Sequence, residues 1–334
     1  MDPILLMIIA IIVALAFDMM NGFHDTANSV ATVIYTKALP PNVAIGIAAL
    51  MNMIGPFILG TAVAKVIATS IIPTELLTIK IVIAGLMGAI IWDLLTWYYG
   101  LPVSSSHALI GGLVGGGIAA IGISGILWEG LTKVFLALLV SPIVGVVLGF
   151  IVMIFLGRYV ISRMDKDKSN SVFKKIQVLS SAAVSLTHGS NDAQKTMGII
   201  AMFVAVTYGY SDIKIETWMI IACALAIGLG TALGGWRIIR TLGERIGNQE
   251  LSPSQGFAAE TSTAITIAVG SAIGAPISTT HVLSSGVVGT VMSGGRGVLN
   301  KKVVANILMA WGLTIPVAAI AAMASYVVLT LVGI

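Results

Sequence analysis

The chain carries very little charge, since only 10% of its 334 residues are Asp, Glu, Lys or Arg. Soluble domains contain about 25% charged residues, so a soluble protein of this length and composition could not cover its surface. Hydrophobic residues make up 57% of the sequence, and the mean hydropathy is +1.02. We therefore expect an all-α polytopic membrane protein embedded in a lipid bilayer.

Cysteine is almost absent, because Cys223 is the single one and lies in an apolar run. An intrachain disulfide is thereby excluded, and a small packing residue is the simplest interpretation. The formal charge of +4 does not indicate nucleic-acid binding, because the basic residues gather between apolar stretches. They are densest in residues 158–175, which the positive-inside rule predicts to be a basic cytoplasmic linker.

The sequence contains several long apolar stretches. The candidate spans are Ile4–Met20, Val43–Ala68, Leu76–Tyr98, Val134–Leu156, Ile176–Leu186, Trp218–Gly234 and Val303–Val332. A helix needs about 20 apolar residues to cross the hydrocarbon core, so several stretches suffice and others fall short.

Two polar motifs occur twice in this apolar sequence. Residues 22–28 (GFHDTAN) return as 189–195 (GSNDAQK), and residues 102–107 (PVSSSH) return as 276–281 (PISTTH). The two motifs keep the same order in each half of the chain. This duplication predicts one central site built from two membrane repeats.

The linker divides the chain into a first repeat, residues 1–157, and a second repeat, residues 176–334. The second repeat carries Arg237, Arg240 and Arg245 in a middle loop, whereas the corresponding residues 70–75 contain no basic side chain. Loops with opposite cationic content should face opposite sides of the membrane. We therefore expect inverted repeats rather than parallel ones.

An aspartate lies at the centre of each copy of the first motif. Asp25 directly follows the first predicted span, and Asp192 follows a stretch, Ile176–Leu186, that is too short to cross. Neither residue therefore needs to lie in a solvated loop. The alternative is that each aspartate caps a helix at a loop end, but a cap does not explain why Gly-x-x-Asp recurs with polar neighbours.

The second motif predicts broken helices. A proline precedes each hydroxyl trio, Ser104–Ser106 and Ser278–Thr280, and a glycine-rich apolar run follows it. Proline ends one helical piece and the hydroxyls cap the next, which gives re-entrant hairpins. About ten helical residues span ~15 Å, half of the hydrocarbon core, so the helix N-termini should meet at the midplane. Such ends bind anions, and two of them could surround a tetrahedral oxyanion.

The predicted site requires charge compensation. Asp25 and Asp192 would repel a bound anion in a low-dielectric site, and Lys195 is the single basic residue of the motifs apart from histidine. The carboxylates are tolerable beside the anion if cations bind with it. Hard cations take oxygen ligands, which Asn28, Asn191 and Gln194 also supply. The residues thus predict cation-coupled anion uptake.

Other ionisable residues have open roles. His107 and His281 both follow a hydroxyl trio, so we expect a shared role, either in bracing the broken helix through a backbone carbonyl or as a ligand or proton relay. The residues without a positional equivalent of the same type are His24, His188, Asp93 and Glu260. Asp93 and Glu260 contribute either to the site or to helix pairing.

The four motif copies, in this order, resemble the inorganic phosphate transporter (PiT) family, in particular its prokaryotic branch. Ser190 stands where the family signature Gly-Ala-Asn-Asp has Ala, and His24 stands where it has Asn. The resemblance implies a secondary active transporter of orthophosphate, a homodimer in the cell inner membrane, and neither enzyme activity nor a cofactor. Sodium is the expected co-transported ion; proton coupling or carriage of a metal–phosphate complex is the alternative.

The expected ligands follow from these motifs. Those for phosphate are Ser104, Ser105, Ser106, Ser278, Thr279, Thr280, Asn28, Gln194 and Lys195. Those for sodium are Asp25, Asn28, Asn191, Asp192 and Gln194.

Two other classes of protein are less consistent with the motifs. An intramembrane hydrolase needs one activated serine with a base and an oxyanion hole, whereas the hydroxyls here come as two matched trios. An anion channel can use half-helix dipoles, but buried carboxylates would hinder anion conduction unless cations travel too.

Overall fold

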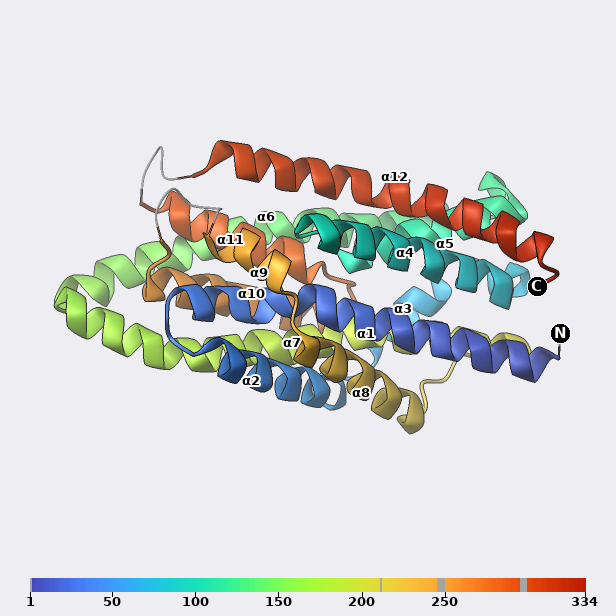
Figure 1. Ribbon diagram of the computed structural model, residues 1–334, viewed down its shortest axis with the longest axis horizontal. Helices are drawn as coiled ribbons and strands as arrows, with labels where there is room; N and C mark the ends of the chain where they lie inside the picture. Colours follow the sequence, from blue (N-terminus) through green and yellow to red (C-terminus); the bar gives the residue numbers. More distant parts are fainter. Residues whose placement is uncertain (1, 211, 245–249, 295–298) are drawn as a thin grey trace.

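The computed structural model describes residues 2–210, 212–244, 250–294 and 299–334, so Arg245 lies outside the described residues. They form an elongated bundle of helices whose two chain ends lie at the same end of the bundle (Figure 1). We call this the terminus end, and the opposite end, where the linker lies, the linker end.

The helices fall into two sets separated by the linker. The first set is α1 (Pro3–Tyr35), α2 (Pro41–Ile54), α3 (Ala62–Thr69), α4 (Ile79–Tyr99), α5 (Ser105–Ile121) and α6 (Trp128–Tyr159). The second set is α7 (Lys166–Tyr208), α8 (Thr217–Leu233), α9 (Trp236–Glu244), α10 (Pro253–Ala272), α11 (Thr279–Met292) and α12 (Lys301–Leu331).

Several helices are suited to cross a membrane, as predicted. Among the described residues, four are long and apolar enough to do so by length and composition alone: α1, α4, which is part of a hairpin described below, α6 with its 3-10 extension, and α12. The candidate span Val43–Ala68 is not one continuous helix, because the chain bends by 75° between Pro41–Phe57 and Ala62–Thr69. Gly60 lies at this bend with φ +76°, a backbone conformation that glycine adopts without steric cost.

The two aspartate motifs lie inside long helices and not after short ones, which corrects the predicted boundaries. Helix α1 has 33 residues and contains Asp25, and α7 has 43 residues and contains Asp192. The expected end of the span at Leu186 is absent. Both helices continue because the motif side chains find polar partners on neighbouring helices, so no solvated break is needed.

The two repeats are inverted. Helix α1 runs from the terminus end toward the linker end, and α7 runs the opposite way (Figure 1). Helices α4 and α5 pack together as one re-entrant hairpin, and α10 and α11 form the other. The last helix of each repeat packs against the hairpin of the other repeat: α12 packs against α5, and α6 packs against α11.

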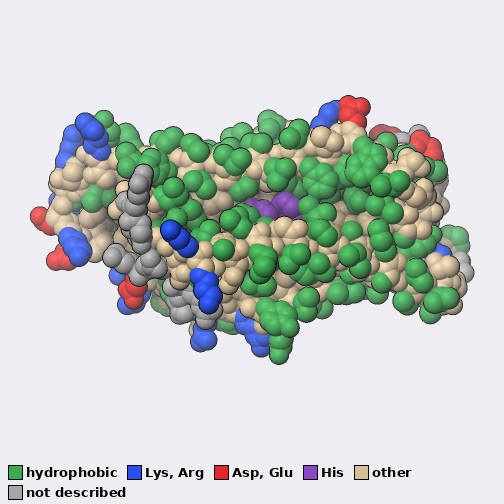
Figure 2. Space-filling view, turned by 90° about the horizontal axis from the view of Figure 1, so that it is seen from above, with side chains coloured by type: hydrophobic (Ala, Val, Ile, Leu, Met, Phe, Trp, Pro, Cys, Tyr) green, Lys and Arg blue, Asp and Glu red, His purple; other side chains and the backbone are tan. Residues whose placement is uncertain are grey.

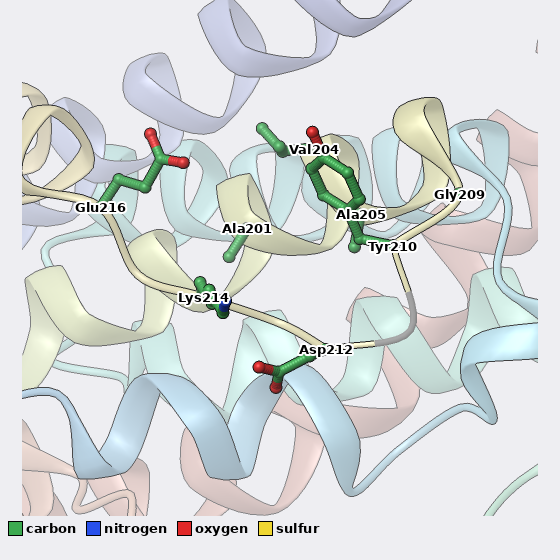
Figure 3. A pocket seen from close by; sticks show the side chains of 8 residues that line it. All are labelled: Ala201, Val204, Ala205, Gly209, Tyr210, Asp212, Lys214 and Glu216. Carbon is green, nitrogen blue, oxygen red and sulfur yellow. The ribbon is translucent and has the colours of Figure 1, made fainter.

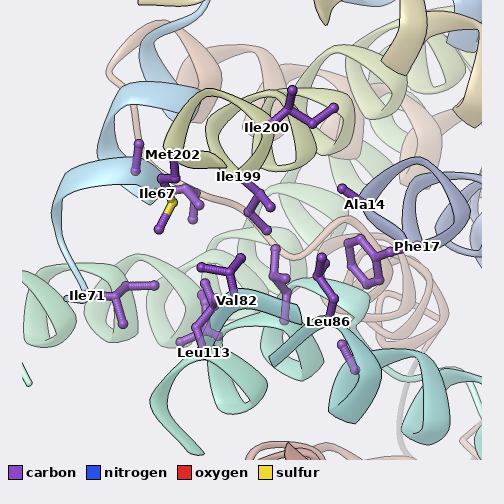
Figure 4. Close-up of a cluster of buried hydrophobic side chains, with 14 of the residues drawn as sticks. Ala14, Phe17, Ile67, Ile71, Val82, Leu86, Leu113, Ile199, Ile200 and Met202 are labelled. Carbon is purple, nitrogen blue, oxygen red and sulfur yellow. The ribbon is translucent and has the colours of Figure 1, made fainter. Parts of the chain in front are cut away.

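A buried apolar cluster fixes the first hairpin against the long helices. Phe17 of α1, Leu86 of α4, and Ile199 and Ile200 of α7 belong to it (Figure 4). Within the hairpin, α4 and α5 approach closely where a Cβ atom at Gly112 would lie 2.1 Å from the Gly85 carbonyl oxygen. The absence of side chains at this contact brings the two backbones together.

The outer surface is mostly apolar along the length of the bundle, while Lys and Arg are most numerous toward the linker end (Figure 2). Residues 158–175 are not a simple loop there. They comprise the last turn of α6, a 3-10 turn at Ile161–Arg163 and the first turns of α7. The basic side chains of this segment are exposed, apart from the partly buried Lys174.

Candidate functional site

The hydroxyl trios begin the two short helices of the hairpins, as the sequence predicts. Ser104 Oγ accepts a hydrogen bond from the His107 backbone N–H at 3.2 Å, and Ser278 Oγ accepts one from the His281 N–H at 3.2 Å. Each serine is thus an N-cap. Helices α5 and α11 have 17 and 14 residues, longer than the ten or so expected.

The N-termini of α5 and α11 meet inside the bundle. Ser106 Oγ, at the start of α5, donates to the Ile277 carbonyl oxygen just before α11 at 3.3 Å. The helices then run in opposite directions, α5 toward the terminus end and α11 toward the linker end (Figure 1). Two positive helix ends therefore point at one buried region.

Both aspartates lie in this region and are almost fully buried. The Thr279 hydroxyl lies 3.5 Å from Asp25 Oδ2 and 3.5 Å from Asp192 Oδ2, so it sits between the two carboxylates. The Thr280 hydroxyl lies 3.2 Å from Asp25 Oδ2. The structure thus joins the first motif of both repeats to the hydroxyl trio of the second.

Two matching polar contacts cross between the repeats. Asn28 Nδ2 of the first repeat donates to Thr280 Oγ1 of the second at 2.8 Å. Lys195 Nζ of the second repeat donates to Ser106 Oγ of the first at 2.6 Å. Lys195 also binds Asp192 and donates to the Ile277 carbonyl at 3.1 Å, although its side chain is only 2% exposed. Each repeat therefore completes the site of the other.

Two histidines join the carboxylates. His188 Nε2 lies 3.1 Å from Asp192 Oδ2 and 3.8 Å from Asp25 Oδ2, and its Nδ1 lies 3.0 Å from Asn52 Oδ1. One ligand atom from each of Asp25, His188 and Asp192 falls within a 4.8 Å group. His24 Nδ1 lies 2.7 Å from Asp25 Oδ1. The sequence signal for His188 was its spacing of one helical turn from Asp192.

The amide side chains of the motifs divide into two kinds. Asn28 Oδ1 and Asn191 Oδ1 are buried without a hydrogen-bond partner in the described chain, so they are available as ligands. Gln194 is already engaged, because its Oε1 accepts from the Val63 backbone N–H at the start of α3 at 2.9 Å. Its amide group also lies 3.4 Å from Ser190 Oγ.

The histidine rings of the second motif lie against each other, and one of them stacks on a tryptophan. The ring centroids of His107 and His281 are 4.4 Å apart, and His281 lies 3.7 Å from the Trp311 ring. Trp311 Nε1 donates to the Pro102 carbonyl at 3.0 Å. These contacts hold the hairpin ends against α12.

The remaining buried carboxylates differ in their surroundings. Glu260 accepts hydrogen bonds from Thr32 at 2.5 Å, from Gln177 at 2.9 Å and from Ser180, so it pairs α10 with α1 and α7. Asp93 has no hydrogen-bond partner in the described chain and lies near His24 and Asp25. Asp18, which the sequence reasoning missed, is likewise buried without a partner.

A separate surface pocket of about 440 Å³ lies where α7 ends (Figure 3). Its charged lining residues are Asp212, Lys214 and Glu216, which follow α7 in the chain. None of the predicted site residues lines it. The buried polar group between the repeats, and not this pocket, is therefore the candidate site.

The buried group suits an anion that enters together with cations. Two helix N-termini, three hydroxyls and one ammonium group supply donors for an oxyanion. Two carboxylates and two unpartnered amide oxygens supply ligands for hard cations. The anion donors and the cation ligands lie together in one buried region, as expected for a secondary transporter with discontinuous helices at the midplane.

Comparisons with known proteins agree with this class. A profile described as the phosphate transporter family matches residues 21–322. A probable low-affinity inorganic phosphate transporter of Rhizobium meliloti is 42% identical over 99% of this chain and 98% of its own. One of Bacillus subtilis is 41% identical over 99% of this chain and 100% of its own. A solved structure, described as the sodium-dependent phosphate transporter, is 27% identical, with a TM-score of 0.85 over 98% of this chain and 99% of that chain.

The fold and the site thus define an integral membrane transporter rather than an enzyme. The chain belongs to the phosphate transporter family.

Proposed function

We propose that the protein imports inorganic phosphate by symport with cations, of which sodium is the principal one. The observation that carries this proposal is the convergence of Asp25 and Asp192 on Thr279, beside the N-termini of α5 and α11. Donors for an anion and ligands for cations lie within the same buried group. Phosphate and its co-ions can therefore neutralise each other there.

The charges of the site support coupling. With neutral histidines, the two aspartates and Lys195 sum to one negative charge before phosphate arrives. Phosphate adds one or two more, and repulsion between buried like charges is strong. Binding sodium at the carboxylates removes this repulsion, so the ion and the anion favour each other's binding.

The proposed ligands are taken from the contacts. Phosphate would be bound by the N-terminal turns that begin at Ser104 and Ser278. The side chains that would donate to phosphate are Ser106 of α5, Thr279 and Thr280 of α11, Asn28 of α1 and Lys195 of α7. Sodium would be bound by Asp25 and Asp192 together with the unpartnered Oδ1 atoms of Asn28 and Asn191. Ser105 and Gln194 would act near the site, Gln194 by fixing α3.

The similar solved structure is that of a transporter described as sodium-dependent, which supports sodium as the coupling ion here. The test is uptake of labelled phosphate into proteoliposomes, with sodium and proton gradients imposed separately. We expect an inward sodium gradient alone to drive concentrative uptake. Uptake that responds only to the proton gradient would overturn sodium coupling.

Proton coupling, or carriage of a neutral metal–phosphate complex, is the second candidate. The position of His188 within 3.1 Å of Asp192 and 3.8 Å of Asp25 favours proton coupling, because histidine exchanges protons near neutral pH. The same proteoliposome experiment separates the two candidates.

We further propose that residues 1–157 and 176–334 are the two repeats, that the protein is a homodimer in the cell inner membrane, and that the linker end faces the cytoplasm. The basic side chains of residues 158–175 support this orientation. Labelling of Lys168→Cys, in the Cys223→Ala background, with a membrane-impermeant thiol reagent tests the sidedness. The mass of the detergent-solubilised protein tests the dimer.

A further inference from the structure

Asp18 is a buried carboxylate that the central site does not use. It lies in α1 and is 0% exposed, and neither of its oxygens has a hydrogen-bond partner in the described chain. Its neighbours include Phe17 and Cys223, which belong to the apolar cluster, and Figure 4 shows the Phe17 side chain inside it. An ionised carboxylate in such surroundings is costly unless a counter-charge binds it.

Two more oxygen atoms near Asp18 are buried and have no hydrogen-bond partner among the described residues. Thr196 Oγ1 faces the carboxylate from α7, and Thr196 is 0% exposed. Asn21 lies three residues after Asp18 and so shares its face of α1. The Asn21 amide nitrogen donates to Asp192 Oδ2 at 3.4 Å, which leaves its oxygen without a donor.

The chemistry of these atoms selects the ligand. Two carboxylate oxygens, one amide oxygen and one hydroxyl form a set of oxygen ligands, which hard cations prefer. The one ammonium group near Asp18 in the described part of the chain, Lys195, is bound to Asp192, Ser106 and the Ile277 carbonyl. One buried negative charge whose oxygens lack hydrogen-bond partners in the described chain matches one monovalent cation.

We propose that Asp18, Asn21 and Thr196 form a second sodium site, between α1 and α7. It lies seven residues from Asp25, about 10 Å along the helix toward the terminus end. Asn21 connects the two sites, because its amide nitrogen binds Asp192 while its oxygen faces the second cation. This inference rests on the proposed sodium-coupled function and adds one ion to it.

The test is equilibrium binding of radioactive sodium to the purified full-length protein in detergent. We expect Asp18→Asn to lose one bound sodium per chain at saturating sodium, and Thr196→Val to weaken that same sodium about tenfold. Thr290→Val is the matched control, because Thr290 is also fully buried but its hydroxyl donates to the Val287 carbonyl in α11. Its sodium count and affinity should equal those of the unmodified protein.

The outcomes separate this inference from the proposed function. If phosphate uptake is driven by sodium but both variants bind sodium as the unmodified protein does, the second site is absent and the symport proposal stands. If the unmodified protein binds no sodium, both proposals fall. Should Asp18→Asn not fold, the sodium affinity of Thr196→Val decides alone, and an unchanged affinity overturns the inference.

Discussion

The two repeats meet at the site with the same geometry but with different charge. Asn28 reaches from the first repeat to Thr280, and Lys195, its equivalent 167 residues later, reaches from the second repeat to Ser106, the equivalent of Thr280. The crossed contacts show that neither repeat can form the site by itself. Because lysine replaces asparagine in the second repeat, Asp192 has a positively charged partner in Lys195. Asp25 contacts the histidines His24 and His188 instead.

The hairpins differ in a second way. A Cβ atom at Gly112 of α5 would lie 2.1 Å from the backbone of α4, whereas one at the equivalent Gly286 of α11 would lie 3.2 Å from the Ser262 side chain. At Gly286 the Ala259 carbonyl oxygen would lie 3.3 Å away, so the backbones of the first hairpin approach each other more closely than those of the second. The first should behave as the more rigid unit.

Removing the carboxylate of either repeat should have the largest effect on phosphate uptake, because both repeats are needed for the site. Asp192→Asn leaves the Lys195 ammonium buried without its ion pair, and Asp25→Asn removes the other cation ligand. Breaking a buried ion pair costs about 4 kcal/mol, so we expect phosphate uptake to fall on the order of a thousandfold in proteoliposomes. Glu129→Gln, an exposed acid beside Lys133, is the control. Near-normal uptake with unchanged ion dependence in both variants would refute the cation argument.

A glycine replacement tests the difference between the hairpins. Gly112→Ala forces α4 and α5 apart and should cost about 3 kcal/mol of unfolding free energy. Gly286→Ala brings the added methyl group no closer than 3.2 Å to its neighbours, which a small shift relieves, so it should cost less than about 1 kcal/mol. Thermal unfolding of the two variants in detergent measures both effects. Equal losses of stability would mean that the hairpins are packed alike.

Lys195→Asn makes the second repeat chemically like the first. A hydrogen bond from a charged group contributes about 2 kcal/mol, so phosphate affinity should weaken roughly 30-fold. Phosphate KM in proteoliposomes measures it, and Lys175→Asn on the exposed linker is the matched control. An unchanged KM would show that Lys195 has a structural role only.

The smallest expected effect compares equivalent hydroxyls. Thr279 lies between both carboxylates, while Ser105, 174 residues earlier, has no hydrogen-bond partner in the described chain. Thr279→Ala should weaken phosphate binding about fivefold, for the loss of ~1 kcal/mol, and Ser105→Ala less. Phosphate KM and sodium activation are both measured. Equal loss of phosphate and sodium affinity in Thr279→Ala would mean that the assigned roles are mixed.

Much of the arrangement could be predicted because its signals are local. Proline followed by hydroxyls marks a helix start, so the sequence alone predicts Ser104 and Ser278 as caps. The inverted order of the repeats follows from loop charge. The duplication of the motif predicts that Asp25 and Asp192 share one central site.

The rest depends on contacts between distant helices. The continuity of α7 through Asp192 follows from partners such as Asn21, which the sequence places 171 residues away. Gln194 binds the start of α3 instead of facing the site, a pairing that no periodicity reveals. Asp18 was overlooked because it has no counterpart in the second repeat, and a search for repeated motifs finds only residues that have one.

The unbroken course of α7 has a mechanical consequence. At 43 residues it is about 65 Å long, roughly twice the hydrocarbon thickness, and Asp192 lies past its midpoint. The stem that carries Lys166 and Lys168 therefore projects beyond the lipid, with no joint between it and the ion ligand. A tilt of this projecting part of α7 would therefore move the Asp192 carboxylate inside the bundle.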